Sequence, residues 1–195
     1  MRKVIFSMQV SLDGFISRPN GELDWLPPIN DENLWKDIQE EMWNQLDSAD
    51  TILLGRITYQ FWENYWPNIK ANPSATENDI KFSHFADKTQ KIVFSKTLDK
   101  VEWKNTRLIK ENIAKEILKM KKQSGKNMVI PGGASIAQTF MKLDLIDEYV
   151  LIIHPIILGS GKPLFEGLNN SIKLKLLRTR MLKSGAILVH YESVK

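Results

Sequence analysis

The sequence contains no cysteine. This absence excludes disulfides, thiolate metal sites, iron–sulfur clusters and a cysteine nucleophile, and it fits a cytoplasmic protein. Long hydrophobic runs are also missing: no stretch approaches the roughly 18 apolar residues that cross a bilayer, so we expect no membrane partner. The first apolar run is interrupted at Ser7, Gln9 and Ser11 and stops at Asp13 without a small-residue cleavage site. It therefore favours a strand over a signal peptide.

The sequence also lacks a strong excess of one charge. Lys and Arg number 27 against 23 Asp and Glu, which leaves a formal net charge of +4, and the charges are interspersed. Nucleic acid is therefore not the expected partner, because proteins that bind it concentrate basic residues in a patch or an arm. At 195 residues and 43% hydrophobic content, the chain predicts a single domain over residues 1–195.

Short apolar runs and helical repeats alternate through the first 145 residues or so. The runs predict strands at 4–10, 51–55, 91–95 and 127–131, and the repeats predict helices at 31–46, 58–66, 112–122 and 135–143. Strands that alternate with helices imply parallel pairing through right-handed crossovers. The polar segment 68–79 is expected to be a surface loop.

The last fifty residues contain strand patterns and no helix. They comprise a long apolar strand at 148–158, an alternating segment at 173–177, and a segment at 181–191 that folds over a turn at Ser184 and Gly185. We therefore predict an α/β fold with a single mixed, mostly parallel twisted sheet, flanking helices and a C-terminal antiparallel hairpin. The long apolar strand indicates either a homodimer or a central strand buried on both faces.

Gly55 stands where a predicted strand ends and a helix begins. Unpaired backbone N–H groups at such a position bind anions. The guanidinium of Arg56 suits a phosphate, and the hydroxyl of Thr58 could add a hydrogen bond to it. The alternative is an ordinary turn with a surface arginine and a capping threonine.

A second glycine turn follows the strand at 127–131. Gly132 and Gly133 allow a ligand to approach the backbone closely, and Ser135 is placed to cap the next helix. Two such turns at the carboxyl ends of parallel strands favour a ligand site at that edge of the sheet. Neither turn matches the Gly-x-Gly-x-x-Gly or P-loop patterns, so the standard dinucleotide and ATPase folds are disfavoured.

Several segments together carry a resemblance to the dihydrofolate reductase-like superfamily. They are Val-Ser-Leu-Asp-Gly-Phe-Ile at 10–16, Leu-Gly-Arg-Ile-Thr-Tyr at 54–59, Val-Ile-Pro-Gly-Gly-Ala at 129–134, and the stretch from Asp147 to the His-Pro-Ile-Ile-Leu-Gly-Ser-Gly at 154–161. The chain is most similar to stand-alone relatives of the reductase domain of the bifunctional riboflavin-biosynthesis deaminase-reductase. The deaminase partner's zinc motif is absent.

The resemblance implies an NADPH-dependent oxidoreductase that transfers a hydride to a small heterocyclic substrate. The first substrate class that it implies is the riboflavin precursor 5-amino-6-(5-phosphoribosylamino)uracil, and a dihydrofolate or pterin reductase is the second. From a different class, the chain could be a nucleotide-binding module without catalysis.

The resemblance also implies which residues bind the cofactor: Gln9, Ile16, Gly55, Arg56, Thr58, Ser95, Lys96, Gly132, Gly133, Ala134 and Ser135. The turn at 55–58 would hold the pyrophosphate and the 2′-phosphate end, positions 95–96 would lie near the adenosine, and 132–135 would flank the pyrophosphate on the nicotinamide side. Positions 9 and 16 would bracket the nicotinamide under a cover formed by the loop 13–21. The family often has a cis peptide bond in the Gly-Gly turn, and such a bond would mark function.

Candidates for the substrate site are fewer. Folate reductases carry on their first helix a carboxylate that binds and polarises the pteridine, and Asp31 and Glu32 both fall near that position as catalytic candidates. An insertion around Pro27 leaves the choice between them open, and solvated acids at a helix start are the alternative. Lys162 is the one candidate for contact with a substrate phosphate.

The histidines and the aromatic cluster have structural interpretations. His84, His154 and His190 show no metal-ligand spacing, so we expect buried, hydrogen-bonded imidazoles and no metal site. The aromatic residues at 59–66 recur at helical spacing, which indicates core and rim packing. A base-stacking platform would come with a basic groove, which the sequence does not show.

Overall fold

The computed structural model describes residues 1–28 and 31–195, and at Glu32 and Lys70 it describes the backbone alone. The strands are β1 (Val4–Ser11), β2 (Phe15–Ser17), β3 (Ala49–Gly55), β4 (Gln90–Phe94), β5 (Thr106–Ile109), β6 (Asn127–Ile130), β7 (Glu148–His154), β8 (Lys162–Pro163), β9 (Leu174–Met181) and β10 (Ile187–Ser193). The helices are α1 (Glu32–Asp47), α2 (Arg56–Tyr65), the 3-10 helix η1 (Trp66–Ala71), α3 (Glu77–Lys88), α4 (Ile113–Lys121) and α5 (Ala134–Lys142).

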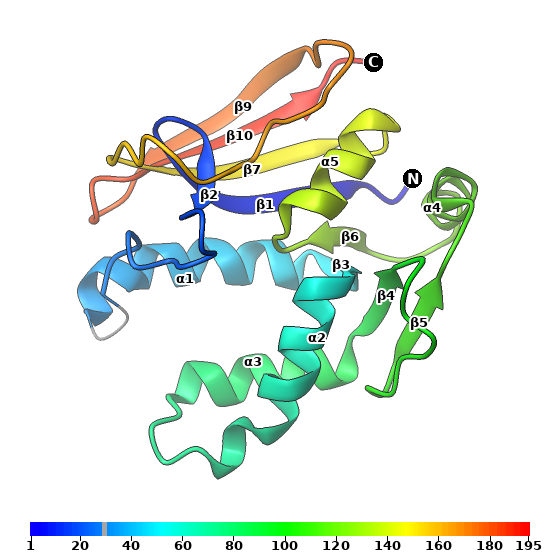
Figure 1. Ribbon diagram of the computed structural model, residues 1–195, viewed down its shortest axis with the longest axis horizontal. Helices are drawn as coiled ribbons and strands as arrows, with labels where there is room; N and C mark the ends of the chain where they lie inside the picture. The colour runs from blue at the N-terminus through cyan, green and yellow to red at the C-terminus, as the bar shows by residue number, and fades with distance from the viewer. Residues whose placement is uncertain (29–30) are drawn as a thin grey trace.

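One sheet organises the molecule, with strand order β5-β4-β3-β6-β1-β7-β10-β9 (Figure 1). Its strands from β5 to β7 pair in parallel. The last two strands form an antiparallel hairpin, and β10 also runs antiparallel to β7. A separate small ladder joins β2 to β8. The predicted mixed, mostly parallel sheet with a C-terminal hairpin is confirmed.

Helices cover both faces of the sheet. Because successive side chains of a strand point to opposite faces, Leu53 of β3 packs in a core cluster with Phe140 of α5, whereas Ile52 packs in another with Phe82 of α3. Helix α1 joins the second face, where Ile38 is fully buried in a cluster with residues of β1, β7 and β10. Its apolar repeat is the reason that the sequence predicts this helix well.

The parallel register places the two glycine turns side by side. Ile52 of β3 pairs with Val129 of β6, so Gly55 and Gly132, each three residues further on, reach the same level of the sheet. Ser95 follows the β4 residue that pairs with Gly55. The three positions therefore gather at the carboxyl edge, where ligands of open α/β sheets bind.

Strand β7 is shorter than the sequence predicts. It ends at His154, because Pro155 has no N–H to continue the ladder. The strand lies between β1 and β10 and is almost entirely buried. Burial on both faces therefore accounts for its apolar composition without a second subunit.

Helix α3, the 3-10 helix η1 and the short strands β2, β5 and β8 were not predicted. Helix α3 begins inside the segment expected to be a loop, and η1 occupies the start of that segment. A capping box starts α3: the Thr76 side chain accepts a hydrogen bond from the Asp79 backbone, and the Asp79 carboxylate accepts one from the Thr76 backbone. Strand β5 is a four-residue edge strand with little apolar pattern.

Candidate functional site

Helices α2 and α5 begin with glycine N-caps at the carboxyl edge of the sheet. Gly55 caps α2 and Gly133 caps α5, so neither N-cap has a side chain to accept from the first backbone N–H groups. Neither helix has an acidic residue in its first turn. The expected capping by Ser135 is wrong, because the helix starts one residue earlier and Ser135 lies exposed within its first turn. Both helix starts are therefore suited to a bound anion.

The two turns are packed against each other. A Cβ atom on Gly133 would lie 3.0 Å from the Thr58 Oγ1 atom, and one on Gly55 would lie 3.3 Å from the Ile136 Cβ atom. Gly132 and Gly133 have φ angles of +138° and +88°, which residues with side chains rarely adopt. Glycine at both positions therefore lets the two turns pack closely, because a side chain at either would press against Thr58 or Ile136. The expected cis peptide bond is wrong for this turn, whose peptide bonds are trans.

Polar side chains surround the first turn. Arg56 is the first residue of α2; it is exposed, and its Nη1 atom donates to Gln60 Oε1 at 3.1 Å. Ser95 uses its Oγ atom to accept from the backbone N–H groups of residues 97 and 98. Lys96 is exposed beside it. The structure thus brings the residues that were expected at the phosphate and adenosine ends to one stretch of the edge.

A hydrogen bond from His154 fixes the side-chain amide of Gln9. The His154 Nε2 atom donates to the Gln9 Oε1 atom at 2.9 Å, and the indole of Trp25 packs edge-on against the imidazole, with ring centroids 5.4 Å apart. Burial lowers the pKa of His154 to about 4, so the ring is neutral near neutral pH. With its oxygen engaged, Gln9 keeps its amide N–H₂ group for other partners.

Beside the glycine turns lies a cleft of about 430 Å³, which is bounded by β1 and β6 and by helices α1 to α3. Gln9 and Pro131 belong to its lining, so the cleft adjoins the Gly132 turn. Aromatic side chains dominate one part of the lining: Trp35, Trp62, Trp66 and Phe82. The aromatic residues of α2 form two groups. Tyr59 and Trp62 are buried, whereas Phe61 and Tyr65 are exposed and stack on each other.

Asp31, one of the two catalytic candidates of the sequence, stands outside the described lining of this cleft. Asp31 is the N-cap of α1 and accepts from the backbone N–H of Leu34 at 3.2 Å. The side chain of Glu32 lies outside the described residues. Instead, α1 turns Gln39 and Gln45 to the cleft, and α3 contributes Asp79. Sequence reasoning missed these residues. The available signal was their helical spacing. Trp35, Gln39, Met42 and Gln45 are three or four residues apart, which places them on one face of α1.

The segment expected to cover the nicotinamide is tied to the loop after β7. The Asp13 carboxylate accepts from Ser11 Oγ at 2.7 Å and from the backbone N–H groups of Leu158 and Gly159 at 3.1 and 2.7 Å. These hydrogen bonds lower the pKa of Asp13, and the one from Ser11 has the largest effect. Ile16 is buried in β2. Lys162 pairs in register with Ser17 and is exposed, outside the cleft lining.

The other two histidines differ from each other. His190 Nε2 contacts Glu148 Oε2 at 2.9 Å, and this contact, with help from Lys3, lowers the pKa of Glu148 to about 2. His84 is exposed, so the expectation of a buried ring is wrong there. Among the described residues no group of three or more His, Asp or Glu side chains is arranged to hold a metal ion.

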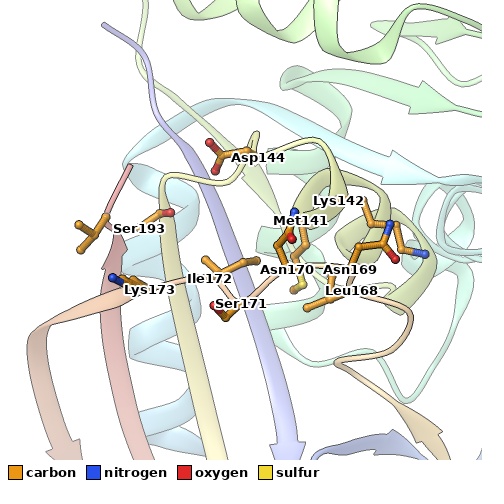
Figure 2. Close-up of a pocket in the computed structure, with 11 residues that line it drawn as sticks. Met141, Lys142, Asp144, Leu168, Asn169, Asn170, Ser171, Ile172, Lys173 and Ser193 are labelled. Atoms are coloured by element: carbon orange, nitrogen blue, oxygen red, sulfur yellow. The ribbon is translucent and has the colours of Figure 1, made fainter.

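A second hollow, of about 420 Å³, lies at the other end of α5 (Figure 2). Its lining comes from the end of that helix, the segment 168–173 and the end of β10. Helix α5 runs back from the glycine turn, so this hollow faces away from the carboxyl edge. It takes no part in the candidate site.

The family model of the RibD C-terminal domain matches residues 2–188. The chain belongs to this family. Two Bacillus subtilis proteins whose functions are uncharacterized, YyaP and YwjB, are 38% and 32% identical to it. The alignments cover 97% of this chain in both cases, and 94% of YyaP and 97% of YwjB.

Solved structures of three other proteins share the fold. A Shewanella sp. PV-4 protein, provisionally described as a riboflavin biosynthesis protein, has a TM-score of 0.72 at 24% identity, with 99% of both chains covered. The riboflavin biosynthesis reductase Rib7 of Saccharomyces cerevisiae has a TM-score of 0.60 at 15% identity, over 99% of this chain and 90% of Rib7. Dihydrofolate reductase from Enterococcus faecalis, solved with NADP(H), has a TM-score of 0.59 at 14% identity, over 99% and 97%. These similarities place the fold among dihydrofolate reductase-like folds.

None of the helices in the described part of the chain combines the length and apolar character that a membrane span requires.

Proposed function

We propose that this RibD C-terminal domain protein is an NADPH-dependent oxidoreductase that reduces a small heterocyclic substrate. One observation carries the proposal: the starts of α2 and α5, each with a glycine N-cap and no first-turn acid, adjoin each other at the carboxyl edge of the sheet. Two positive helix ends over bare backbone suit the diphosphate of a dinucleotide. Family membership supports the oxidoreductase class.

The chain's residues would divide the work of binding as follows. Thr58 and the 132–135 turn would hold the diphosphate, and the exposed guanidinium of Arg56 would select a 2′-phosphate. The amide of Gln9, fixed by His154, would orient the nicotinamide next to the cleft. When bound, the reduced nicotinamide supplies a hydride to the carbon of a C=N or C=O bond.

The remaining residues position the substrate and a proton source. The aromatic lining excludes water and sets the plane of a flat ring. Asp79 is the acid among the described lining residues, and it or a water molecule beside it would deliver the proton. Asp79 belongs to the cleft lining and Asp31 does not, which makes Asp79 the better-placed carboxylate.

The first substrate class to test is the aminouracil riboflavin precursor, since the chain shares a fold with Rib7. A dihydrofolate or pterin substrate is the second class, because the same fold is found in a dihydrofolate reductase. A nucleotide-binding module without catalysis is the third possibility.

Fluorescence titration and a turnover assay separate these functions. We expect the nicotinamide fluorescence to change on titration with NADPH at lower concentrations than with NADH. The loss of nicotinamide absorbance is then followed after each candidate substrate is added. Turnover of dihydrofolate would favour the second class, and tight NADPH binding without turnover of any substrate would favour the module. Failure to bind either coenzyme would refute the proposal.

We also propose that the protein works in the cytoplasm as a homodimer. Strand β9 ends the sheet order, and its Leu176, Leu177 and Met181 side chains are 51%, 44% and 80% exposed. An edge strand with exposed apolar side chains is a template for pairing with another chain, and a second copy would cover these side chains.

A further inference from the structure

The substrate cleft carries almost no charge. Among the described residues that line it there is no Lys, Arg or His, and Asp79 is the single ionisable side chain. A phosphate monoester brings about 1.5 to 2 negative charges at neutral pH, and proteins usually meet it with Arg, Lys or a free helix N-terminus. The only fixed charge offered by this lining has the same sign as the phosphate.

The start of α3 faces the cleft, and its capping hydrogen bonds are already made within the chain. The first turn of α3 contains the lining residues Asn78 and Asp79. There the Thr76 Oγ1 atom accepts from the Asp79 N–H at 3.1 Å, and the Asp79 carboxylate accepts from the Thr76 N–H at 3.0 Å. Glu77 adds another acid to the same turn. This end of α3 therefore presents negative charge, in contrast to the starts of α2 and α5.

Nearby described lysines do not compensate. The Nζ atom of Lys81 lies 3.9 Å from the centroid of the Trp43 ring, and Trp43 is outside the cleft lining. Lys162 is exposed beside Gly21, where a Cβ atom would lie 3.4 Å from its Nζ. Neither ammonium group belongs to the lining.

The lining does offer neutral hydrogen-bonding groups. The side-chain amides of Gln39 and Gln45 make no hydrogen bond to any described residue, so all their donors and acceptors remain available. Asn78 has its oxygen occupied by the Trp43 indole N–H at 2.8 Å, which leaves its N–H₂ group. Amides pair with the ring nitrogens and carbonyls of a heterocycle, and the neighbouring indoles stack on its faces.

We infer that the molecule reduced in this cleft is an uncharged, flat heterocycle without a phosphate group. For an aminouracil, this means the ribosylamino nucleoside and not its 5′-phosphate. The inference rests on the proposed function for the reaction itself, while the choice of ligand rests on the lining alone.

A matched pair of ligands tests the inference. Binding of 5-amino-6-ribosylaminouracil and of its 5′-phosphate to the full chain is measured by calorimetry, with and without saturating NADPH. We expect the nucleoside to bind at least about tenfold more tightly, because the phosphate would face Asp79 without a cation among the described lining residues. Equal binding, or tighter binding of the phosphate, would overturn the inference, and so would a failure of both the nucleoside and a neutral pterin to bind.

Two variants locate the effect in the cleft. Gln39→Arg adds a cation to the lining and should reduce or reverse the preference for the nucleoside, whereas Gln123→Arg places the same charge on an exposed site at the end of α4 and should leave it unchanged. An equal response of both variants would mean that overall charge sets the preference. NADPH oxidation is recorded separately: if the nucleoside binds but is never reduced, the proposed function fails and the ligand preference stands.

Discussion

The Thr58 hydroxyl lies against the face of Gly133 from which a side chain would project, 3.0 Å from the position of its Cβ atom. Thr58 belongs to α2 and Gly133 caps α5, so this contact joins two crossovers that are far apart in the sequence. A methyl group on Gly133 would press against Thr58 and Ile136 and shift the two turns to which we assign the diphosphate.

Gly133→Ala is expected to weaken NADPH binding by at least about tenfold, because the new methyl group meets Thr58 and because a φ of +88° costs a residue with a side chain about 1–2 kcal/mol. Gly185→Ala is the control: its φ is +79°, but it lies in the β9–β10 turn. Both variants should lose stability in urea, with Gly133→Ala losing more because of its contacts with Thr58 and Ile136, and only Gly133→Ala should lose NADPH affinity. Unchanged affinity in Gly133→Ala would contradict the assigned site.

Arg56→Gln tests coenzyme selection. The guanidinium is exposed at the start of α2 and makes one hydrogen bond, to Gln60. Removing a charged hydrogen bond to phosphate should weaken NADPH binding by about ten- to hundredfold and leave NADH binding nearly unchanged. Equal losses for both coenzymes would show that Arg56 does not contact the 2′-phosphate. Lys119→Gln, an exposed charge near the end of α4, controls for the change in net charge.

The alternating part of the fold could be predicted because local pattern and global order agree. Runs such as Leu53–Leu54 and the repeat around Ile38 each have one dominant period, and a parallel sheet follows from their order. Helix α3 was missed because its apolar stripe is weak, although the Thr76 capping box was readable. The length of β7 was overestimated because Pro155 was included in an otherwise apolar run.

The candidate site also has a part that could be predicted from the sequence and a part that could not. The glycine turns could be predicted, since a glycine that ends a strand has a local cause. The cleft lining could not, because Gln39 and Asp79 meet there only through the packing of α1 and α3 on the sheet. Asp31 was chosen because it falls near the first-helix carboxylate of folate reductases, and its place at the helix start explains its use as an N-cap.

Leu176→Lys tests the proposed dimer. The leucine is 51% exposed on β9, and a lysine there should repel a second copy and shield the edge. Light scattering should give the wild-type protein about twice its 22.5 kDa chain mass and the variant a mass near 22.5 kDa. Leu118→Lys, at a leucine 50% exposed on α4, should remain dimeric. A wild-type mass of one chain at high concentration would refute the dimer.

His154 should make folding stability depend on pH. Its pKa falls from 6.5 to about 4 on folding because of burial, so between these values the unfolded chain binds more protons. The contribution is complete above pH 6.5 and is lost as the pH falls toward 4, by up to about 3 kcal/mol.

Urea unfolding of the wild type and of His154→Gln at several pH values measures this contribution. The variant removes the imidazole but keeps a side chain that can hydrogen-bond to Gln9, and the acid-sensitive carboxylates, such as Glu148, are common to both proteins. The difference in unfolding free energy between the two should therefore shrink steadily from pH 6.5 to 4. A constant difference would show that the imidazole titrates with the same pKa in the folded and unfolded chains. His154 would then not be the neutral, buried donor that fixes Gln9.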